Sequence, residues 1–102
     1  MRLEGEMATY VLLSTLTDEG AKTIKNNPDR IREVNAEFEA LGVKIVAQFT
    51  VLGPYDFVSI VEAPDNSTIA RFSVELAARG SVKIMTLPAV PVEEFIAGLK
   101  RA

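Results

Sequence analysis

The sequence predicts an α+β domain in which four antiparallel strands form one sheet and two helices cover one of its faces. Strand-like and helix-like segments alternate along the chain in the order β-α-β-β-α-β. A short sequence also recurs where each helix passes into the next strand, as residues 40–45 (ALGVKI) and 78–84 (ARGSVKI). We infer two similar βαβ halves, and right-handed crossovers then give the strand order 4-1-3-2.

The first half begins with residues 8–16, which are rich in β-branched and aromatic side chains and contain no Gly or Pro, as is typical of a strand. Thr17 is placed to cap a helix over about residues 18–26. The pair Asn27-Pro28 predicts that this helix breaks and restarts with proline in its first position, and Gly42 ends the continuation. The apolar stripe of that continuation is Ile31, Val34, Phe38 and Leu41.

The second half repeats this plan. Residues 43–52 and 57–63 predict two strands joined by the turn Gly53-Pro54-Tyr55-Asp56. Residues 65–67 offer helix caps, and the helix that follows has Ile69, Phe72, Leu76 and Ala77 on its apolar face and ends at Gly80. Residues 81–87 form the fourth strand, halted at Pro88, before a short amphipathic helix over about residues 91–99. This arrangement is ferredoxin-like, with residues 1–7 as a loose N-terminal extension and residues 8–97 as one domain.

Alternation along each strand predicts which side chains face away from the helices, although the first strand allows either phase. The side chains expected to meet the helices are Val11, Leu13, Val43, Ile45, Ala47, Phe49, Val58, Ile60, Val82 and Ile84. The apolar ones expected on the uncovered face are Leu12, Leu16, Val46, Leu52, Phe57, Val61, Met85 and Leu87, and the polar ones include Tyr10, Ser14, Lys44, Gln48, Thr50, Ser59 and Lys83. Because so apolar a patch is typical of a partner surface, we expect a homodimer or higher homo-oligomer that packs through this face, with the C-terminal helix as a latch.

Composition excludes many kinds of active site. The 102 residues include no Cys and no His, so thiol nucleophiles, imidazole bases and the usual zinc and haem ligands are absent, and we expect no metal or cofactor. The formal net charge of −3 argues against nucleic acid as a partner. No stretch approaches the ~20 apolar residues of a membrane span, so we expect a cytoplasmic protein that does not bind membranes.

Polar residues gather at one edge of the predicted sheet. They are Ser14, Thr15, Thr17, Tyr55, Asp56, Arg79, Ser81 and Lys83. These residues predict a small pocket in which Arg79 or Lys83 favours an anionic group and Tyr55 and Asp56 donate and accept hydrogen bonds. Gln48 and Thr50 would line a cavity between two sheets. For Asp56, a role in ordering the turn is favoured over a role in binding.

Four segments resemble the GYD-domain family, which is named for a Gly-x-Tyr-Asp turn. They are residues 10–17, 18–21, 53–58 and 76–82, and the turn corresponds to Gly53, Tyr55 and Asp56 with Pro54 between them. The resemblance covers about residues 8–97. It implies a dimeric α+β barrel built on the ferredoxin-like fold, found in bacterial and archaeal proteins without an established biochemical role.

Three functions remain open at this point. The first is a homo-oligomer that binds a small apolar or anionic molecule between subunits, which the mixed uncovered face favours. The second is a cofactor-independent enzyme, like a monooxygenase or an isomerase, with Asp56 or Lys83 as base and Tyr55 as hydrogen-bond donor. The third is a purely structural role in assembly. The residues available favour binding over catalysis.

Overall fold

The computed structural model describes residues 6–101, so most of the predicted N-terminal extension, residues 1–5, lies outside the described residues. The elements in order are β1 (Ala8–Leu16), α1 (Asp18–Asn26), α2 (Arg30–Ala40), β2 (Lys44–Thr50), β3 (Phe57–Ala63), α3 (Asn66–Ala77), β4 (Val82–Ala89) and α4 (Val92–Lys100). None of the helices within this part of the chain is both long and apolar enough to cross a membrane.

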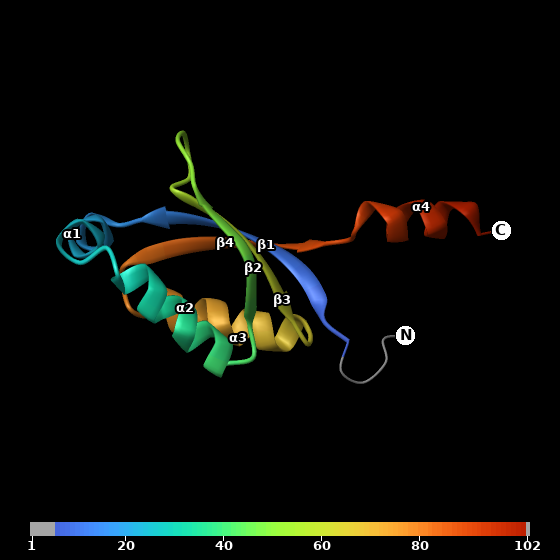
Figure 1. Cartoon of the computed structure of the whole chain (residues 1–102), viewed down its shortest axis with the longest axis horizontal. Coiled ribbons are helices and arrows are strands. Elements are labelled where there is room, and N and C mark those ends of the chain that lie inside the picture. Colours follow the sequence, from blue (N-terminus) through green and yellow to red (C-terminus); the bar gives the residue numbers. More distant parts are fainter. Residues whose placement is uncertain (1–5, 102) are drawn as a thin grey trace.

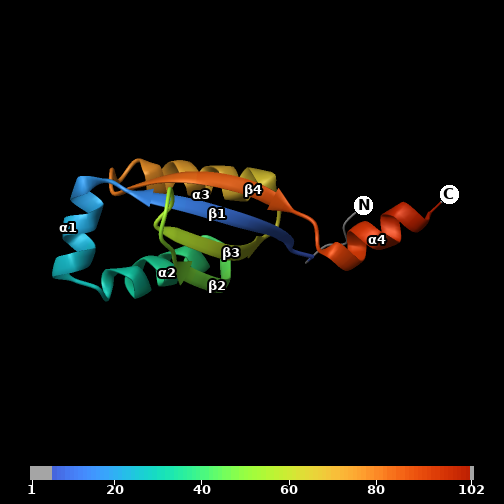
Figure 2. The ribbon, with the colours of Figure 1, turned by 90° about the horizontal axis from the view of Figure 1, so that it is seen from above.

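The four strands form one antiparallel sheet in the order β2-β3-β1-β4, which is the predicted order read from the other edge. Helices α2 and α3 lie against one face of the sheet, and α1 lies at its end (Figure 1). The opposite face carries no helix of the described chain. Helix α4 projects away from the sheet along the long axis of the molecule (Figure 2). The chain therefore has a covered face, an uncovered face and an arm.

Local signals placed most helix ends correctly. The hydroxyl of Thr17 accepts the Gly20 N–H at 3.1 Å and caps α1, and the Asp65 carboxylate accepts the Thr68 N–H at 2.8 Å and caps α3. Gly42 has a φ of 87°, a conformation that glycine adopts without strain and that ends a helix. The start of α2 was predicted too early, because the chain turns through Pro28 and the helix begins at Arg30.

Strand β4 does not stop at Pro88 as predicted. It continues to Ala89, with Pro88 paired opposite Tyr10. Proline lacks the N–H that a central strand needs, but β4 is an edge strand with a free side on which no donor is required.

The core lies between the sheet and α2 and α3. Tyr10 and Phe72 are its largest fully buried side chains, and the rings of Phe38 and Phe72 meet edge to face with centroids 4.3 Å apart. The remaining buried apolar residues are Leu12, Val43, Val61, Ala63 and Ile69.

The phases chosen for β1 and β3 were wrong. Tyr10 and Leu12 are buried under the helices, and their direct partners Val61 and Ser59 are buried with them. Direct partners in an antiparallel pair share a face. The side chains that therefore lie on the uncovered face are Val11, Leu13, Val58 and Ile60. Both strands carry apolar residues on both faces, so alternation could not show which set is buried.

The prediction for β2 fails halfway along the strand. Its register against β3 shifts between Ile45 and Ala47, so Val46 is an extra residue and the alternation reverses after it. As a result Gln48 and Thr50 turn toward the covered face and Phe49, 59% exposed, turns away from it. The phase of β4 was predicted correctly, with Ile84 facing the helices and Lys83 exposed.

The uncovered face is apolar as expected, but from a different set of residues. Its apolar members are Val11, Leu13, Ala47, Phe49, Val58, Ile60, Met85 and Leu87. Of the expected members, Leu12, Leu16, Phe57 and Val61 belong to the covered side. Leu52 is fully exposed in the β2–β3 turn, and Val46 is exposed at the bulge.

Candidate functional site

The sheet divides the predicted pocket residues into two groups. Ser14, Gln48, Arg79 and Ser81 line a cavity on the helix-covered side. Thr15, Tyr55 and Lys83 border a shallow depression on the uncovered side. Asp56 and Thr17 bind backbone atoms at the sheet's end. The expected residues therefore lie near one edge of the sheet, as the topology requires, but they do not share one pocket.

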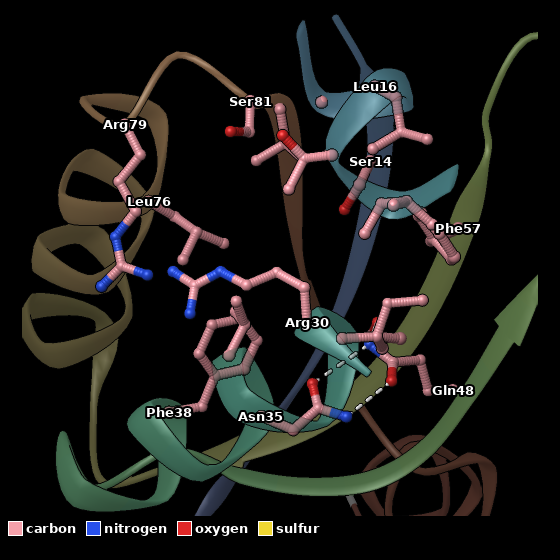
Figure 3. A pocket seen from close by; sticks show the side chains of 17 residues that line it. Ser14, Leu16, Arg30, Asn35, Phe38, Gln48, Phe57, Leu76, Arg79 and Ser81 are labelled. Carbon is pink, nitrogen blue, oxygen red and sulfur yellow. Dashed lines mark hydrogen bonds between the residues drawn. The ribbon is translucent and has the colours of Figure 1, made fainter. Parts of the chain in front are cut away.

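The helix-side cavity has a volume of about 120 Å³ and lies between the sheet and helices α1, α2 and α3 (Figure 3). Ser14, Gln48 and Ser59 supply its polar floor. Apolar side chains including Leu16, Phe38, Phe57, Leu76 and Val82 supply its walls. The site therefore combines a small polar surface with a mostly apolar enclosure, as small-molecule sites commonly do.

A chain of three polar side chains crosses this floor. Asn35 Nδ2 donates to Gln48 Oε1 at 2.8 Å, and Gln48 Nε2 donates to Ser59 Oγ at 3.2 Å and to Asn35 Oδ1 at 3.4 Å. Ser59 is only 4% exposed, so these bonds satisfy polar groups that burial would otherwise penalise. Gln48 was expected on the uncovered face because the bulge at Val46 is not visible in the sequence pattern, and Ser59 because the phase of β3 was wrong. Asn35, in α2, was not predicted.

Two partly exposed arginines, Arg30 and Arg79, line the mouth of the cavity, and both pair with Glu37. Arg79 Nη2 contacts Glu37 Oε2 at 2.5 Å, and Arg30 Nη1 contacts Glu37 Oε1 at 3.4 Å and Glu33 Oε1 at 3.2 Å. The hydrogen bond from Arg79, assisted by both positive charges, holds the pKa of Glu37 below its usual range. Arg30 and Glu37 are functional candidates that the sequence analysis did not identify, since their helix looked like an ordinary solvated charged face.

Asp56 fastens the turn to the sheet. Its N–H donates to the Ser14 carbonyl at 2.8 Å, and its Oδ2 accepts the Leu16 N–H at 2.8 Å. Its own carbonyl accepts the Val51 N–H at 2.9 Å and the Thr50 hydroxyl at 3.2 Å. The motif aspartate thus joins β1, the end of β2 and the start of β3, which supports the structural role. The carboxylate is already engaged, so the enzyme alternative loses its first candidate base.

On the uncovered side, Tyr55 reaches across to β4. Its hydroxyl donates to Met85 Sδ at 3.8 Å, next to the pair formed by Thr15 and Lys83. Together with Leu13 these residues border the depression. Within residues 6–101 no group of three His, Cys, Asp or Glu residues is placed to hold a metal ion.

These features define a small α+β domain with a cavity beneath its helices, an apolar uncovered sheet face and a Gly-Pro-Tyr-Asp turn. Residues 10–99 match the GYD domain family, so the chain belongs to that family. It is 60% identical over 95 residues to the "Glutamine synthetase and cystathionine beta-lyase binding protein" of Thermus thermophilus, a match that covers 92% of this chain and 100% of the relative. No solved structure matches the sequence significantly.

Proposed function

We propose that this chain is a protein-binding domain that acts as a homodimer and associates with metabolic enzymes such as glutamine synthetase and cystathionine beta-lyase. The observation that carries the enzyme partners is the 60% identity to a relative named for binding them, which extends over that relative's full length. The exposed apolar surfaces of this chain support protein binding in general, since such patches mark interaction sites.

A direct binding experiment tests the enzyme partners. Glutamine synthetase and cystathionine beta-lyase from one organism are each mixed with this protein and sedimented, and the Thermus relative serves as the positive control. We expect this protein to co-sediment with both enzymes. If the relative binds both enzymes under the same conditions and this protein binds neither, the proposed function is wrong.

The proposed homodimer packs uncovered sheet face against uncovered sheet face, as in a dimeric α+β barrel built on a ferredoxin-like fold. The face presents Phe49, Met85 and Leu87 as exposed large apolar side chains. A second copy presents the same face, so the contact is self-complementary about a two-fold axis. In this arrangement Tyr55 and Lys83 border the space between the sheets.

The sheet face by itself is too small for a stable dimer interface, which supports a role for α4 in the dimer. Four strands of seven to nine residues cover roughly 500 Å² at ordinary strand spacings, whereas a stable interface buries about 800 Å² per partner. Helix α4 has no buried residue, and its Phe95 and Leu99 are 57% and 71% exposed. The family match runs to residue 99 and so includes α4. We therefore assign α4 to the second copy as a latch that adds the missing area.

Substitution on the uncovered face tests the dimer. Phe49→Glu places a charge in the proposed interface, where burial without a partner is costly, and we expect sedimentation velocity at about 10 µM to show a monomer. Val74→Glu is the matched control, because Val74 is 69% exposed on the helix side, and this variant should remain a dimer. A monomeric wild-type protein, or a dimeric Phe49→Glu variant, would overturn the proposed interface.

A further inference from the structure

The cavity beneath the helices is a gap in an otherwise closed core. Toward the other end of the sheet the space between the layers is filled by Tyr10, Val61 and Phe72, which are 0–1% exposed. Around the cavity the covered face instead presents the small side chains of Ser14, Ser59 and Ser81. Apolar cavities of roughly 150 Å³ accept a molecule of the size of benzene. A volume of about 120 Å³ is therefore suited to a compact group of about five or six carbons.

The floor retains hydrogen-bonding capacity. Ser59 Oγ accepts a bond from Gln48 Nε2, and a hydroxyl that accepts can still donate its own proton. The Ser14 hydroxyl makes no side-chain hydrogen bond within the described residues, although Ser14 lines the cavity. The floor can therefore bind one polar atom of an otherwise apolar ligand.

The mouth of the cavity carries two guanidinium groups, those of Arg30 and Arg79. Arg30 lies in α2 and Arg79 follows α3, and their guanidinium groups lie near each other (Figure 3), with side chains 35% and 36% exposed. Each uses one terminal nitrogen in its ion pairs with glutamates. The other guanidinium N–H groups remain as donors in the fork geometry that matches a carboxylate. The two arginines share Glu37 and Arg30 also pairs with Glu33, so a bound carboxylate would use the guanidinium N–H groups that these two glutamates leave free.

We propose that this cavity binds a small carboxylic acid, with a compact apolar body under the helices and its carboxylate on Arg30 and Arg79. The apolar walls select the body, and the two guanidinium forks select the anion over a neutral molecule of the same shape. An ammonium group next to the carboxylate would lie close to both arginines, so unsubstituted acids are favoured over α-amino acids. This site lies on the opposite side of the sheet from the proposed dimer interface and is independent of the enzyme partners.

The test compares acids with their neutral amides. Benzoate and 3-methylbutanoate are titrated into the full-length protein while the side-chain amide signals of Asn35 and Gln48 are followed by NMR, with benzamide and 3-methylbutanamide as neutral probes. We expect the acids to shift both signals in a saturable way and to bind at least about tenfold more tightly than the amides, as is typical when a charged hydrogen-bond pair is formed. Equal responses to acid and amide, or no response to either acid, would overturn the proposal.

Two substitutions at the mouth should change the affinity for benzoate in opposite directions. Arg79→Met removes one fork and should weaken benzoate binding at least about tenfold. Arg71→Met is the matched control, because Arg71 pairs only with the exposed Glu75 among the described residues and should leave binding unchanged. Glu37→Gln removes the negative charge that Arg30 and Arg79 share, while Arg30 keeps its pair with Glu33, and should strengthen binding. Unchanged binding by Arg79→Met would contradict the site, as would weaker binding by a folded Glu37→Gln variant.

A cavity-filling variant keeps the test valid if Arg79→Met does not fold. Ser14→Leu breaks no side-chain hydrogen bond and places a larger group inside the cavity, so it should abolish the response to both acids. Thr15→Leu, one residue further along β1 on the opposite face, is its control and should bind as the wild type does. Binding that survives Ser14→Leu would show that the acids bind elsewhere and would overturn the proposal.

Discussion

Single residues at the β2–β3 turn show how the Gly-Pro-Tyr-Asp motif works. Gly53 has a φ of 113°, which side chains rarely tolerate. Two residues later Tyr55 extends over β4, and Asp56 returns the chain to β1 with one backbone and one side-chain hydrogen bond. Gly53, Tyr55 and Asp56 of the motif therefore have structural roles in attaching the β2–β3 hairpin to the sheet.

Replacing Asp56 tests this role at the same scale. Asp56→Ala leaves the Leu16 N–H without its acceptor and should lower the free energy of unfolding by about 1–2 kcal/mol. Asp56→Asn keeps an acceptor oxygen and should lose less than about 1 kcal/mol. Urea denaturation measures both. An Asp56→Ala variant as stable as the wild type would show that the carboxylate does not hold the strand.

At the scale of elements, helices are joined by charged and close backbone contacts as well as by the core. Arg79 follows α3 and binds Glu37 of α2, so one ion pair links the two covering helices. At the other junction, Gly20 of α1 lies directly against the Ser81 carbonyl at the start of β4, and Thr17 donates its hydroxyl to the Gly80 carbonyl at 2.8 Å. These contacts fix the positions of α1, α2 and α3 around the cavity.

The Glu37 link predicts a dependence of stability on pH. The pKa of Glu37 is lowered in the folded chain, so its ionised form stabilises the fold above the ordinary value of about 4.5, and this contribution is lost as pH falls through the lowered folded value. Glu37→Gln should therefore be less stable than the wild type at pH 7, and the difference should close toward pH 3. Urea denaturation at several pH values measures it, with Glu93→Gln on the exposed α4 as the control. A difference that does not change with pH would contradict this origin.

Close packing at Gly20 predicts a second effect between elements. A Cβ at Gly20 would collide with the backbone oxygen of Ser81, so Gly20→Ala should lower the free energy of unfolding by about 1–3 kcal/mol, as forced overpacking does. Gly98→Ala is the matched control, because nothing lies within 4 Å of the equivalent position in α4 and alanine favours the helix. The idea fails if thermal unfolding shows Gly20→Ala to be as stable as Gly98→Ala.

The whole molecule is a compact two-layer body with one element detached from it. The principal extents are 54, 29 and 19 Å, and α4 accounts for much of the length (Figure 2). An amphipathic helix without a buried face gains little from its own chain, since helices of this length depend on tertiary packing. We therefore expect its stability to depend on a partner, which we propose is a second copy.

Removal of α4 separates the folding of the sheet domain from its proposed dimerisation. A chain ending at Val90 keeps all eight apolar residues that are buried in the described part of the chain, so far-UV circular dichroism should show a folded sheet domain. The same chain should dissociate at concentrations where the full chain is dimeric, because it lacks the latch. Sedimentation velocity over a concentration series measures the shift. A truncated chain that dimerises as tightly as the full one would remove α4 from the interface.

The order of the elements and most of their ends could be predicted from the sequence by itself, because these depend on neighbouring residues. Thr17 caps a helix through an N–H three residues away, and Gly42 adopts a positive φ directly after the C-cap of α2. Helix α3 ends at Ala77, three residues before the predicted Gly80. The Gly-Pro-Tyr-Asp turn was likewise visible, and with it the family. None of these features depends on how the layers pack.

Only the tertiary structure decided which face of each strand is buried and which polar residues meet. Strands β1 and β3 are apolar on both faces, so the burial of Tyr10 and Val61 rather than Val11 and Ile60 depends on how α2 and α3 fit the sheet. One extra residue at Val46 then moved Gln48 from the expected outer face to the cavity beside Asn35. The candidate site arises from contacts between residues distant in sequence, and local sequence patterns do not predict such contacts.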